Sequence, residues 1–288
     1  MLQKRGGIRP WLYIGPALLL LVAFLVYPSL DTFRRSLMDA RSEEFVGLRN
    51  YEFAFTAEEM RISFRNNLTW LILFTIFTVA GGLVIAVLVD KVKYESLAKA
   101  LVFLPQAISF VGAGVIWKFI YDYNPNVGLL NAILTTLFPD MDRIGWLVNS
   151  DIATYALIAT GIWIWTGFAM TILSAAVKGI PDEIIDAARM DGASGWQIFW
   201  QVTIPMISST IAVVATTMVI NVLKVFDLVY VMTAGRYRTN VIANQMYKEL
   251  YTNRQNGRAS AISVILLAVI VPVMLVNIRR FQIQEERR

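Results

Sequence analysis

Three polar side chains interrupt an apolar stretch in the last third of the chain: Asn221, Lys224 and Asp227. Such groups are costly in contact with lipid, so they usually face a cavity or another helix. An amide, an ammonium and a carboxylate together could bind a polar solute. Because Lys224 and Asp227 are three residues apart, the spacing favours a local ion pair at a helix end, with a solute-binding or gating role as the alternative. Asn221 could instead bond a neighbouring helix.

Other chemistry is limited by the residues that the sequence lacks. It contains no cysteine and no histidine, which excludes disulfides and thiolate catalysis and removes the commonest neutral-pH acid–base group and metal ligand. No phosphate-binding loop of the form G-x-x-x-x-G-K-[ST] is present, so any ATP hydrolysis requires another chain. We therefore predict no catalytic residue, metal or cofactor. The net charge of +5 is scattered without the basic stripe of a nucleic-acid binder.

The elements that position these groups are apolar helices. Of 288 residues, 57% are hydrophobic and 16% are charged, and several apolar runs approach the 20 or so residues needed to cross a bilayer. We predict an all-α, polytopic membrane protein with a single transmembrane domain over 1–288 and core helices over about 67–278. The six expected spans are 12–33, 67–89, 100–121, 152–176, 204–232 and 259–278.

Orientation in the membrane depends on the Lys and Arg residues of the loops. A raw count is equal for the two sets of loops, but short basic flanks such as "DKVKYESLAK" and "NIRRFQIQEERR" are the stronger determinants. They favour both termini in the cytoplasm of a multi-pass membrane protein. The basic start "MLQKRGGIRP" precedes a long apolar run with no cleavage site, so we interpret it as part of a retained anchor.

The segment "EIIDAARMDGASGWQIFWQVTIP", residues 183–205, is too polar to span a membrane. Asp182 and Glu183 place negative charge at the start of a helix, and Gly192 is suited to end it. Ala187 and Ala188 keep one face thin. The pattern predicts a short cytoplasmic helix over about 182–193 that can enter a groove on another protein.

This segment resembles the signature loop of permease subunits of binding-protein-dependent ABC importers. The family pattern is Glu-Ala-Ala, three residues, Gly, nine residues, then Ile-x-Leu-Pro, and every spacing is met. The matching residues are Asp186, Ala187, Ala188, Gly192, Val202, Ile204 and Pro205. The departures are Asp for Glu, Val for Ile and Ile for Leu. The shorter acid at position 186 leaves its contact with a partner open.

Other stretches are similar to one branch of that family, the carbohydrate permeases related to the larger maltose permease subunit. They are "WLYIGPALLLLVAFLVYPSLDTFRRSL", "VGLRNYEFAF", "FLPQAISFVGAGVIWKFIYDYNPNVGLLNAIL", "FDLVYVMTAG" and "RASAISVIL". One stretch departs from the pattern: the branch usually has Thr, a residue and Gly-Gly-Pro after the fifth helix, whereas this chain has "TAGRYRTN".

The resemblance implies a type I ABC importer permease fold in a bacterial or archaeal plasma membrane, and a set of partners. These are a second permease, two ATPase subunits that bind ATP and magnesium, and an extracytoplasmic sugar-binding protein. Residues 182–193 would be the coupling helix, and the residues implied in contact with the ATPase are Glu183, Asp186, Ala187, Ala188, Gly192 and Pro205.

Counting from the signature also implies a sugar site. Its positions fall at Phe110, Gly114, Trp165, Phe168 and Asn221, with Lys224 and Asp227 nearby. We expect Asn221 to hydrogen-bond the sugar and Trp165 to stack on it, although Trp165 could equally be a packing aromatic. The alternatives are a permease for a polyol, glycerol phosphate or a compatible solute such as glucosylglycerol. An ion-coupled secondary transporter, which would use Lys224 and Asp227, is a more distant alternative.

Overall fold

A computed structural model of the chain describes residues 9–90 and 92–285. Within these ranges the regular structure is helical, with one isolated bridge between Met38 and Phe45, so the all-α prediction is confirmed. Residues 1–8 and 286–288, which include the predicted cytoplasmic termini, lie outside the described residues. The chain forms two compact units, one made of 1–57 and 246–267 and the other of 58–245 and 268–288.

The predicted spans correspond to apolar helices, two of which are bent. Four helices are long and apolar enough to cross a membrane: Leu12–Ser36, Glu58–Val89, Ala153–Lys178 and Asn256–Leu275. Two further helix pairs reach this length only together: Glu95–Ala107 with Phe110–Ile120, bent by 100°, and Gly195–Met206 with Ser208–Leu223, bent by 70°. The protein therefore has up to six spans in the described residues.

Two spans predicted as continuous helices are thus broken. In the stretch 100–121 the break falls after Pro105, where Ile108 has an extended backbone with ψ of 138°. In the stretch 204–232 the helix is interrupted at Ile207 and ends at Leu223. Apolar composition continues across each break, which is why sequence reasoning placed one helix over each stretch.

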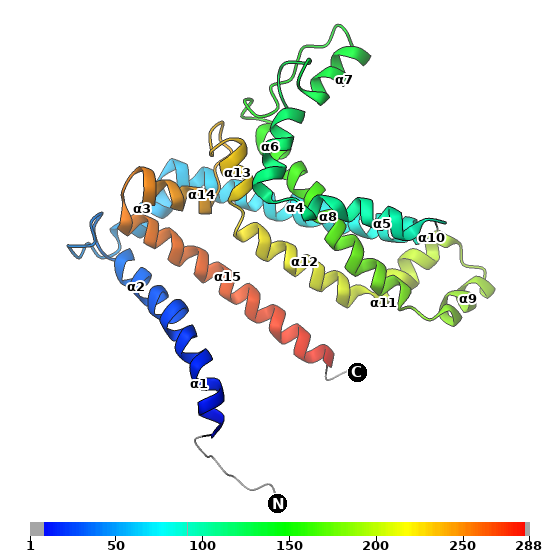
Figure 1. Cartoon of the computed structure of the whole chain (residues 1–288). Coiled ribbons are helices and arrows are strands. Elements are labelled where there is room, and N and C mark those ends of the chain that lie inside the picture. Colours follow the sequence, from blue (N-terminus) through cyan, green and yellow to red (C-terminus); the bar gives the residue numbers. More distant parts are fainter. Residues whose placement is uncertain (1–8, 91, 286–288) are drawn as a thin grey trace, which may run out of the picture. The chain divides into compact units, whose positions relative to one another are not determined.

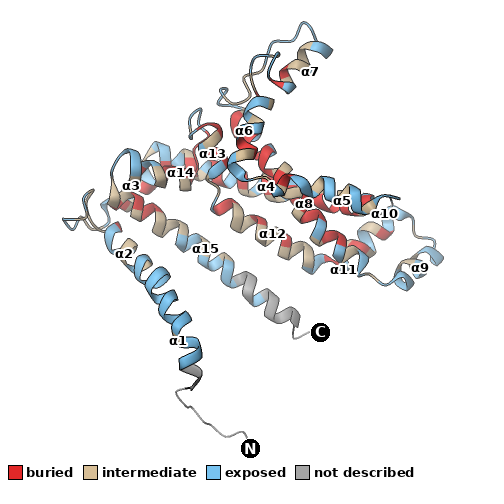
Figure 2. Cartoon of the chain, viewed as in Figure 1, coloured by how far each residue is buried: buried red, intermediate tan, exposed pale blue. Residues whose placement is uncertain are grey.

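The first unit contains the N-terminal helices and the start of the last one. Its elements are α1 (Arg9–Leu21), a π-helical turn (Val22–Val26), α2 (Tyr27–Ser36), α3 (Arg49–Thr56), a second π-helical turn (Lys248–Thr252) and the first part of α15 (Asn256–Glu285). Asn50 joins α3 to the end of α2, because its amide donates to the carbonyls of Ser36 and Met38 at 2.9 and 2.7 Å. Exposed apolar residues cover the described part of α1 and the turn that follows it, as expected of a lipid-facing helix, and Figure 2 colours this stretch as exposed.

The second unit contains the remaining helices. In order they are α4 (Glu58–Val89), α5 (Glu95–Phe103), a 3₁₀ turn (Leu104–Ala107), α6 (Phe110–Ile120), α7 (Leu129–Leu137), α8 (Ala153–Lys178), α9 (Asp182–Met190), α10 (Gly195–Ile198), a π-helical turn (Phe199–Thr203), α11 (Ile204–Met206), α12 (Ser208–Leu223), α13 (Asp227–Met232) and α14 (Ile242–Tyr247). The long helices α4 and α8 lie side by side (Figure 1), and α12 packs on both.

The core of the second unit follows the α4–α8 contact. One apolar cluster surrounds Trp70, Leu157 and Met218, and a second surrounds Leu83, Met170 and Val214. Each cluster joins α4, α8 and α12. Figure 2 shows the buried residues concentrated on α4 and α8. A cavity lies beside the first cluster. The exposed segment α9–α11 connects the end of α8 to the start of α12.

Candidate functional site

The segment 182–205, which contains the signature-like residues, begins with the short helix α9. Pro181 precedes it with ψ of 134°, so the chain enters the helix from an extended conformation, with Asp182 and Glu183 in the first turn. The helix is closed by two backbone bonds, from the N–H of Gly192 to Arg189 and from Ala193 to Ala188, both 3.0 Å. Gly192 has φ of +82°, a conformation that L side chains rarely adopt. Glycine therefore avoids the backbone strain that any other residue would bring to this turn.

The surface of α9 is open to a partner. None of its residues is buried, and Met190 is 89% exposed. Asp186 pairs with Arg189 on the same helix at 2.8 Å, and both side chains are 65% exposed. Around Gly192 no atom lies within 4 Å of the place a Cβ would occupy. The predicted coupling residues Glu183, Ala187 and Ala188 also lie on this helix, and Ala188 is half-buried.

The chain then turns into the fifth span. Ser194 and Gln197 form a reciprocal capping box at the start of α10. Trp196 and Trp200 are exposed, in keeping with the aromatic anchors found at membrane surfaces. Pro205 lies in α11, two residues before the bend at Ile207. The predicted coupling residues therefore occupy one continuous helix–turn–helix segment.

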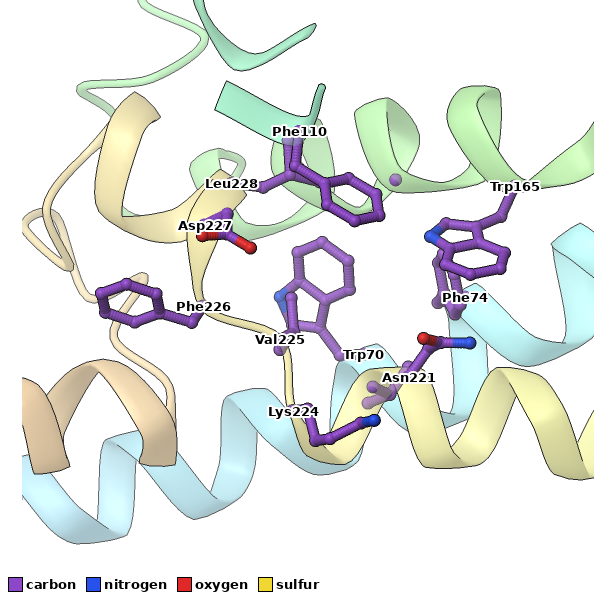
Figure 3. Close-up of a pocket in the computed structure, with 12 residues that line it drawn as sticks. Trp70, Phe74, Phe110, Trp165, Asn221, Lys224, Val225, Phe226, Asp227 and Leu228 are labelled. Carbon is purple, nitrogen blue, oxygen red and sulfur yellow. The ribbon is translucent and has the colours of Figure 1, made fainter. Parts of the chain in front are cut away.

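A cavity of about 270 Å³ lies inside the second unit. Its wall is supplied by α4, α6, α8, α12, α13 and the link between the last two (Figure 3). The lining residues are Trp70, Phe74, Phe110, Gly161, Trp165, Asn221, Val222, Lys224, Val225, Phe226, Asp227 and Leu228.

Aromatic rings form much of the wall. Phe110 and Trp165 stack with ring centroids 6.1 Å apart, and Trp70 and Phe74 lie 5.9 Å apart at a tilted angle. Gly161 of α8 allows the Trp70 ring to approach, because a Cβ there would lie 2.9 Å from the indole. Flat apolar faces of this kind suit the C–H faces of a sugar ring.

The polar part of the wall comes from the end of α12 and the start of α13. Asn221 donates from its amide nitrogen to the Thr217 carbonyl at 3.0 Å, so its amide oxygen is left for another partner. Lys224 ends α12, and Asp227 begins α13 after a non-helical link in which Phe226 has φ of −145°. The wall thus offers a hydrogen-bond acceptor, a cation and an anion.

The local ion pair expected between Lys224 and Asp227 is not formed. No ion pair of the described residues joins these two side chains within 4.0 Å. The i,i+3 geometry of a continuous helix does not apply, because the helix stops at Leu223 and a new one starts at Asp227. Both side chains are therefore left to line the cavity.

The structure brings together five of the seven predicted sugar-site residues: Phe110, Trp165, Asn221, Lys224 and Asp227. Phe168 lies outside the lining, with its ring edge-on to Trp165 at 5.6 Å. Gly114 is also outside it and packs on α13, where a Cβ would lie 3.1 Å from the Val231 side chain.

Sequence reasoning did not identify Trp70, Phe74 or Gly161 as lining residues. A partial signal exists in α4, where Asn67, Trp70 and Phe74 recur at helical spacing and share one face. In the ranges 9–90 and 92–285 no group of three or more carboxylates could hold a metal ion. The aromatic faces and polar groups of the lining suit a polar solute.

Comparison with known families gives one match over nearly the whole chain. Residues 18–284 match the model of the family described as "Binding-protein-dependent transport system inner membrane component".

Two curated relatives are similar over their length. The chain is 59% identical to the osmoprotective compounds uptake permease protein GgtC of Synechocystis sp., with 96% of this chain and 100% of the relative covered. It is 46% identical to the alpha-glucoside transport system permease protein AglF of Rhizobium meliloti, with 96% and 84% covered.

Two solved structures share the fold. One is a bacterial ABC transporter involved in the import of the acidic polysaccharide alginate, with a TM-score of 0.80, 22% identity and 96% of each chain covered. The other is a bacterial alginate ABC transporter in complex with an alginate pentasaccharide-bound periplasmic protein, with a TM-score of 0.80, 24% identity and 93% of each chain covered.

Proposed function

Since the chain belongs to the family of binding-protein-dependent transport system inner membrane components and is a membrane-embedded permease subunit of an ABC importer, not an enzyme, we propose that it moves a sugar or glycoside through the cavity of its second unit. Membership of this family argues against the ion-coupled secondary transporter considered from the sequence.

The observation that carries the proposal is the composition of the cavity wall. Aromatic faces from Trp165 and Phe110 are combined with the amide of Asn221, which is the combination that a ring with many hydroxyls requires. Asn221 contributes a hydrogen bond, and Trp165 contributes stacking. The relative AglF is named for alpha-glucoside transport, which supports the same class of solute.

A compatible solute is the second candidate, because the relative GgtC, at 59% identity, is named for uptake of osmoprotective compounds. A glycosylated compatible solute such as glucosylglycerol has the same ring and hydroxyl chemistry as a sugar. The charged lining residues are one cation, Lys224, and one anion, Asp227, so their formal charges cancel. This balance favours a neutral solute over glycerol phosphate.

Transport requires partners. We infer a second permease subunit, two ATPase subunits that carry ATP and magnesium, and an extracytoplasmic binding protein. With both termini in the cytoplasm, α9 projects toward the ATPase. ATP-driven closure of the ATPase pair would move α9 as a lever and expose the cavity to the outside. The loaded binding protein favours that state only if it binds it more tightly than the inward-facing state.

Variants of Gly192 test the coupling role of α9. Both variants bring backbone strain at φ of +82°, but Gly192→Trp also adds a bulky ring. No atom of this chain lies within 4 Å of the Cβ position, so the side chain leaves the helix into open space, where a partner would meet it. We expect Gly192→Ala to keep much of the uptake, and Gly192→Trp to abolish uptake and ATPase co-purification. Equal uptake by the two variants, with the ATPase retained, would disprove coupling through α9.

The solute class is tested with the assembled transporter in proteoliposomes. Its ATP hydrolysis and uptake are measured with its own binding protein and a panel of maltose, other α-glucosides, glucosylglycerol, polyols and glycerol phosphate. We expect stimulation by a neutral glycoside and a loss of uptake in Asn221→Ala without loss of assembly. Stimulation by glycerol phosphate alone would refute the proposal, and unchanged kinetics in Asn221→Ala would remove Asn221 from the site.

A further inference from the structure

In the part of the chain that the structure describes, three tryptophans have a buried indole nitrogen without a hydrogen-bond partner: Trp70, Trp117 and Trp146. Among them Trp70 is the one that lines the cavity between α4, α8, α12 and α13. Its side chain is 1% exposed and belongs to the main apolar cluster. Nearly all buried polar groups in proteins are paired, so an unpaired donor at a cavity wall requires an explanation.

The position of the Trp70 ring is fixed from two sides. Phe74, one turn later on α4, lies 5.9 Å away, and Gly161 of α8 leaves the space that the indole fills. Figure 3 shows the ring among the labelled lining residues, with Phe110 and Asp227 nearby. The ring is therefore held in place while its N–H remains unpaired.

The rest of the wall offers few neutral donors. Asn221 uses one of its two amide hydrogens on the Thr217 carbonyl, which leaves one N–H and the acceptor oxygen, and Asp227 supplies only acceptors when ionised. Lys224 is a further donor but carries charge. A hydroxylated solute presents both hydrogens and lone pairs, so a neutral N–H on the aromatic wall would add a donor on the face opposite in character to the amide.

We propose that the indole N–H of Trp70 donates a hydrogen bond to a hydroxyl oxygen of the transported solute and so makes Trp70 a specificity-determining residue. This inference rests on the proposed function. In the conformation described here the nitrogen is shielded, so the bond forms when the cavity widens to admit the solute. A site that pairs a solute hydroxyl discriminates against an analogue lacking it, because the buried donor is then left unpaired.

The test compares Trp70→Phe with Trp117→Phe. Both variants keep an aromatic ring and remove a buried, unpaired N–H, but Trp117 is not among the lining residues of the cavity. Each is assembled with the second permease, the ATPase and the binding protein in proteoliposomes. Uptake of maltose and glucosylglycerol, and of the monodeoxy analogues of whichever is transported, is measured at saturating binding protein. The binding protein is the same throughout, so its own preferences cancel between variants.

For one monodeoxy analogue we expect the wild type and Trp117→Phe to prefer the parent solute by about tenfold. Trp70→Phe should transport parent and analogue at nearly equal rates. Because the readout is a ratio, it does not depend on the amount of folded transporter. If Trp70→Phe keeps the wild-type ratio for every analogue of a transported parent, the proposal is wrong while the proposed function stands. If the wild type transports no glycoside at all, both are wrong.

Discussion

The two ends of α4 are held to the rest of the second unit by different chemistry. At its first turns, Asn66 donates to the carbonyls of Arg238 and Asn240 at 2.6 and 2.7 Å. Asn67 accepts from the backbone N–H of Ile242 at 2.8 Å. These side chains are buried and neutral.

The amide network continues into the segment that Asn66 and Asn67 bind. Asn240 donates to Gln245 and accepts from Asn244, both at 2.6 Å. No buried side-chain polar atom of these four asparagines lacks a partner in the described part of the chain. The loop "TAGRYRTN", which departs from the family pattern, is therefore held to α4 by hydrogen bonds from asparagine side chains.

The other end of α4, roughly 36 Å away at 1.5 Å per residue, is held by charges. Lys99 of α5 bonds Asp90 at 2.8 Å and Glu95 at 2.5 Å, and Lys178 of α8 also bonds Glu95 at 2.5 Å. Ser174 of α8 donates to Asp90 at 2.8 Å. Side-chain exposure here ranges from 14% for Asp90 to 51% for Lys178.

The difference indicates which end can separate. A buried asparagine amide finds no water to replace its partner once its hydrogen bond is broken, and added salt does not weaken such a hydrogen bond. Partly exposed ions can be taken over by water and salt, so their separation costs less. On the proposed orientation the ionic end faces the cytoplasm, where α9 lies. The comparison therefore predicts that the outer end of α4, with Asn66 and Asn67, stays fixed and that the inner end, next to Asp90, can separate. The following variants test this contrast.

The largest effect is expected from Asn66→Ala. The change leaves the part-buried carbonyl of Arg238 and the buried carbonyl of Asn240 without their donor, at a cost of about 3 kcal/mol. We expect a thermal midpoint several degrees lower for the purified transporter, followed by tryptophan fluorescence. Asn126→Ala, at an exposed asparagine, is the matched control and should leave the midpoint unchanged. Equal midpoints for the two variants would show that the amide network does not fix this end.

Lys99→Met should have an intermediate effect. It removes the cation that joins Asp90 and Glu95, while Lys178 still pairs with Glu95, so we expect a loss of about 1–2 kcal/mol. Raising the salt concentration should reduce the difference in the free energy of unfolding between the variant and the wild type, because salt screens the same ion pairs in the wild type.

Lys118→Met is the control for Lys99→Met. Lys118 is exposed on α6 and forms no ion pair with another described residue. The contrast between the two ends of α4 would be contradicted if Lys118→Met lost stability in a salt-dependent way. It would also be contradicted if the stability lost in Lys99→Met did not change with salt.

Local sequence was enough to predict the segment around α9. The acids at its start, Gly192 at its end and the spacing to Pro205 all act within a few residues, and the structure has a helix at Asp182–Met190. The apolar spans were predictable for a similar reason, since composition over 20 residues sets the cost of contact with lipid.

The bends and the cavity depend on contacts between distant residues. The helix break between Lys224 and Asp227 accompanies the packing of α13 on α6, which the continuous apolar composition does not reveal. Trp70 lines the cavity because α8 carries a glycine at position 161, some 90 residues further on. Tryptophan in an apolar span is otherwise ordinary packing, so its position in the site could not be read from α4 alone.

The smallest effect is expected from Lys178→Gln. Lys178 is half exposed and shares Glu95 with Lys99, so its loss should change the free energy of unfolding by no more than about 0.5 kcal/mol. Thermal unfolding of the single variants and of Lys99→Met/Lys178→Gln gives their coupling. Because either lysine can pair with Glu95 alone, the double variant should lose more than the sum of the single losses. A strictly additive result would mean that the two lysines act independently and that the inner end is not one ionic cluster.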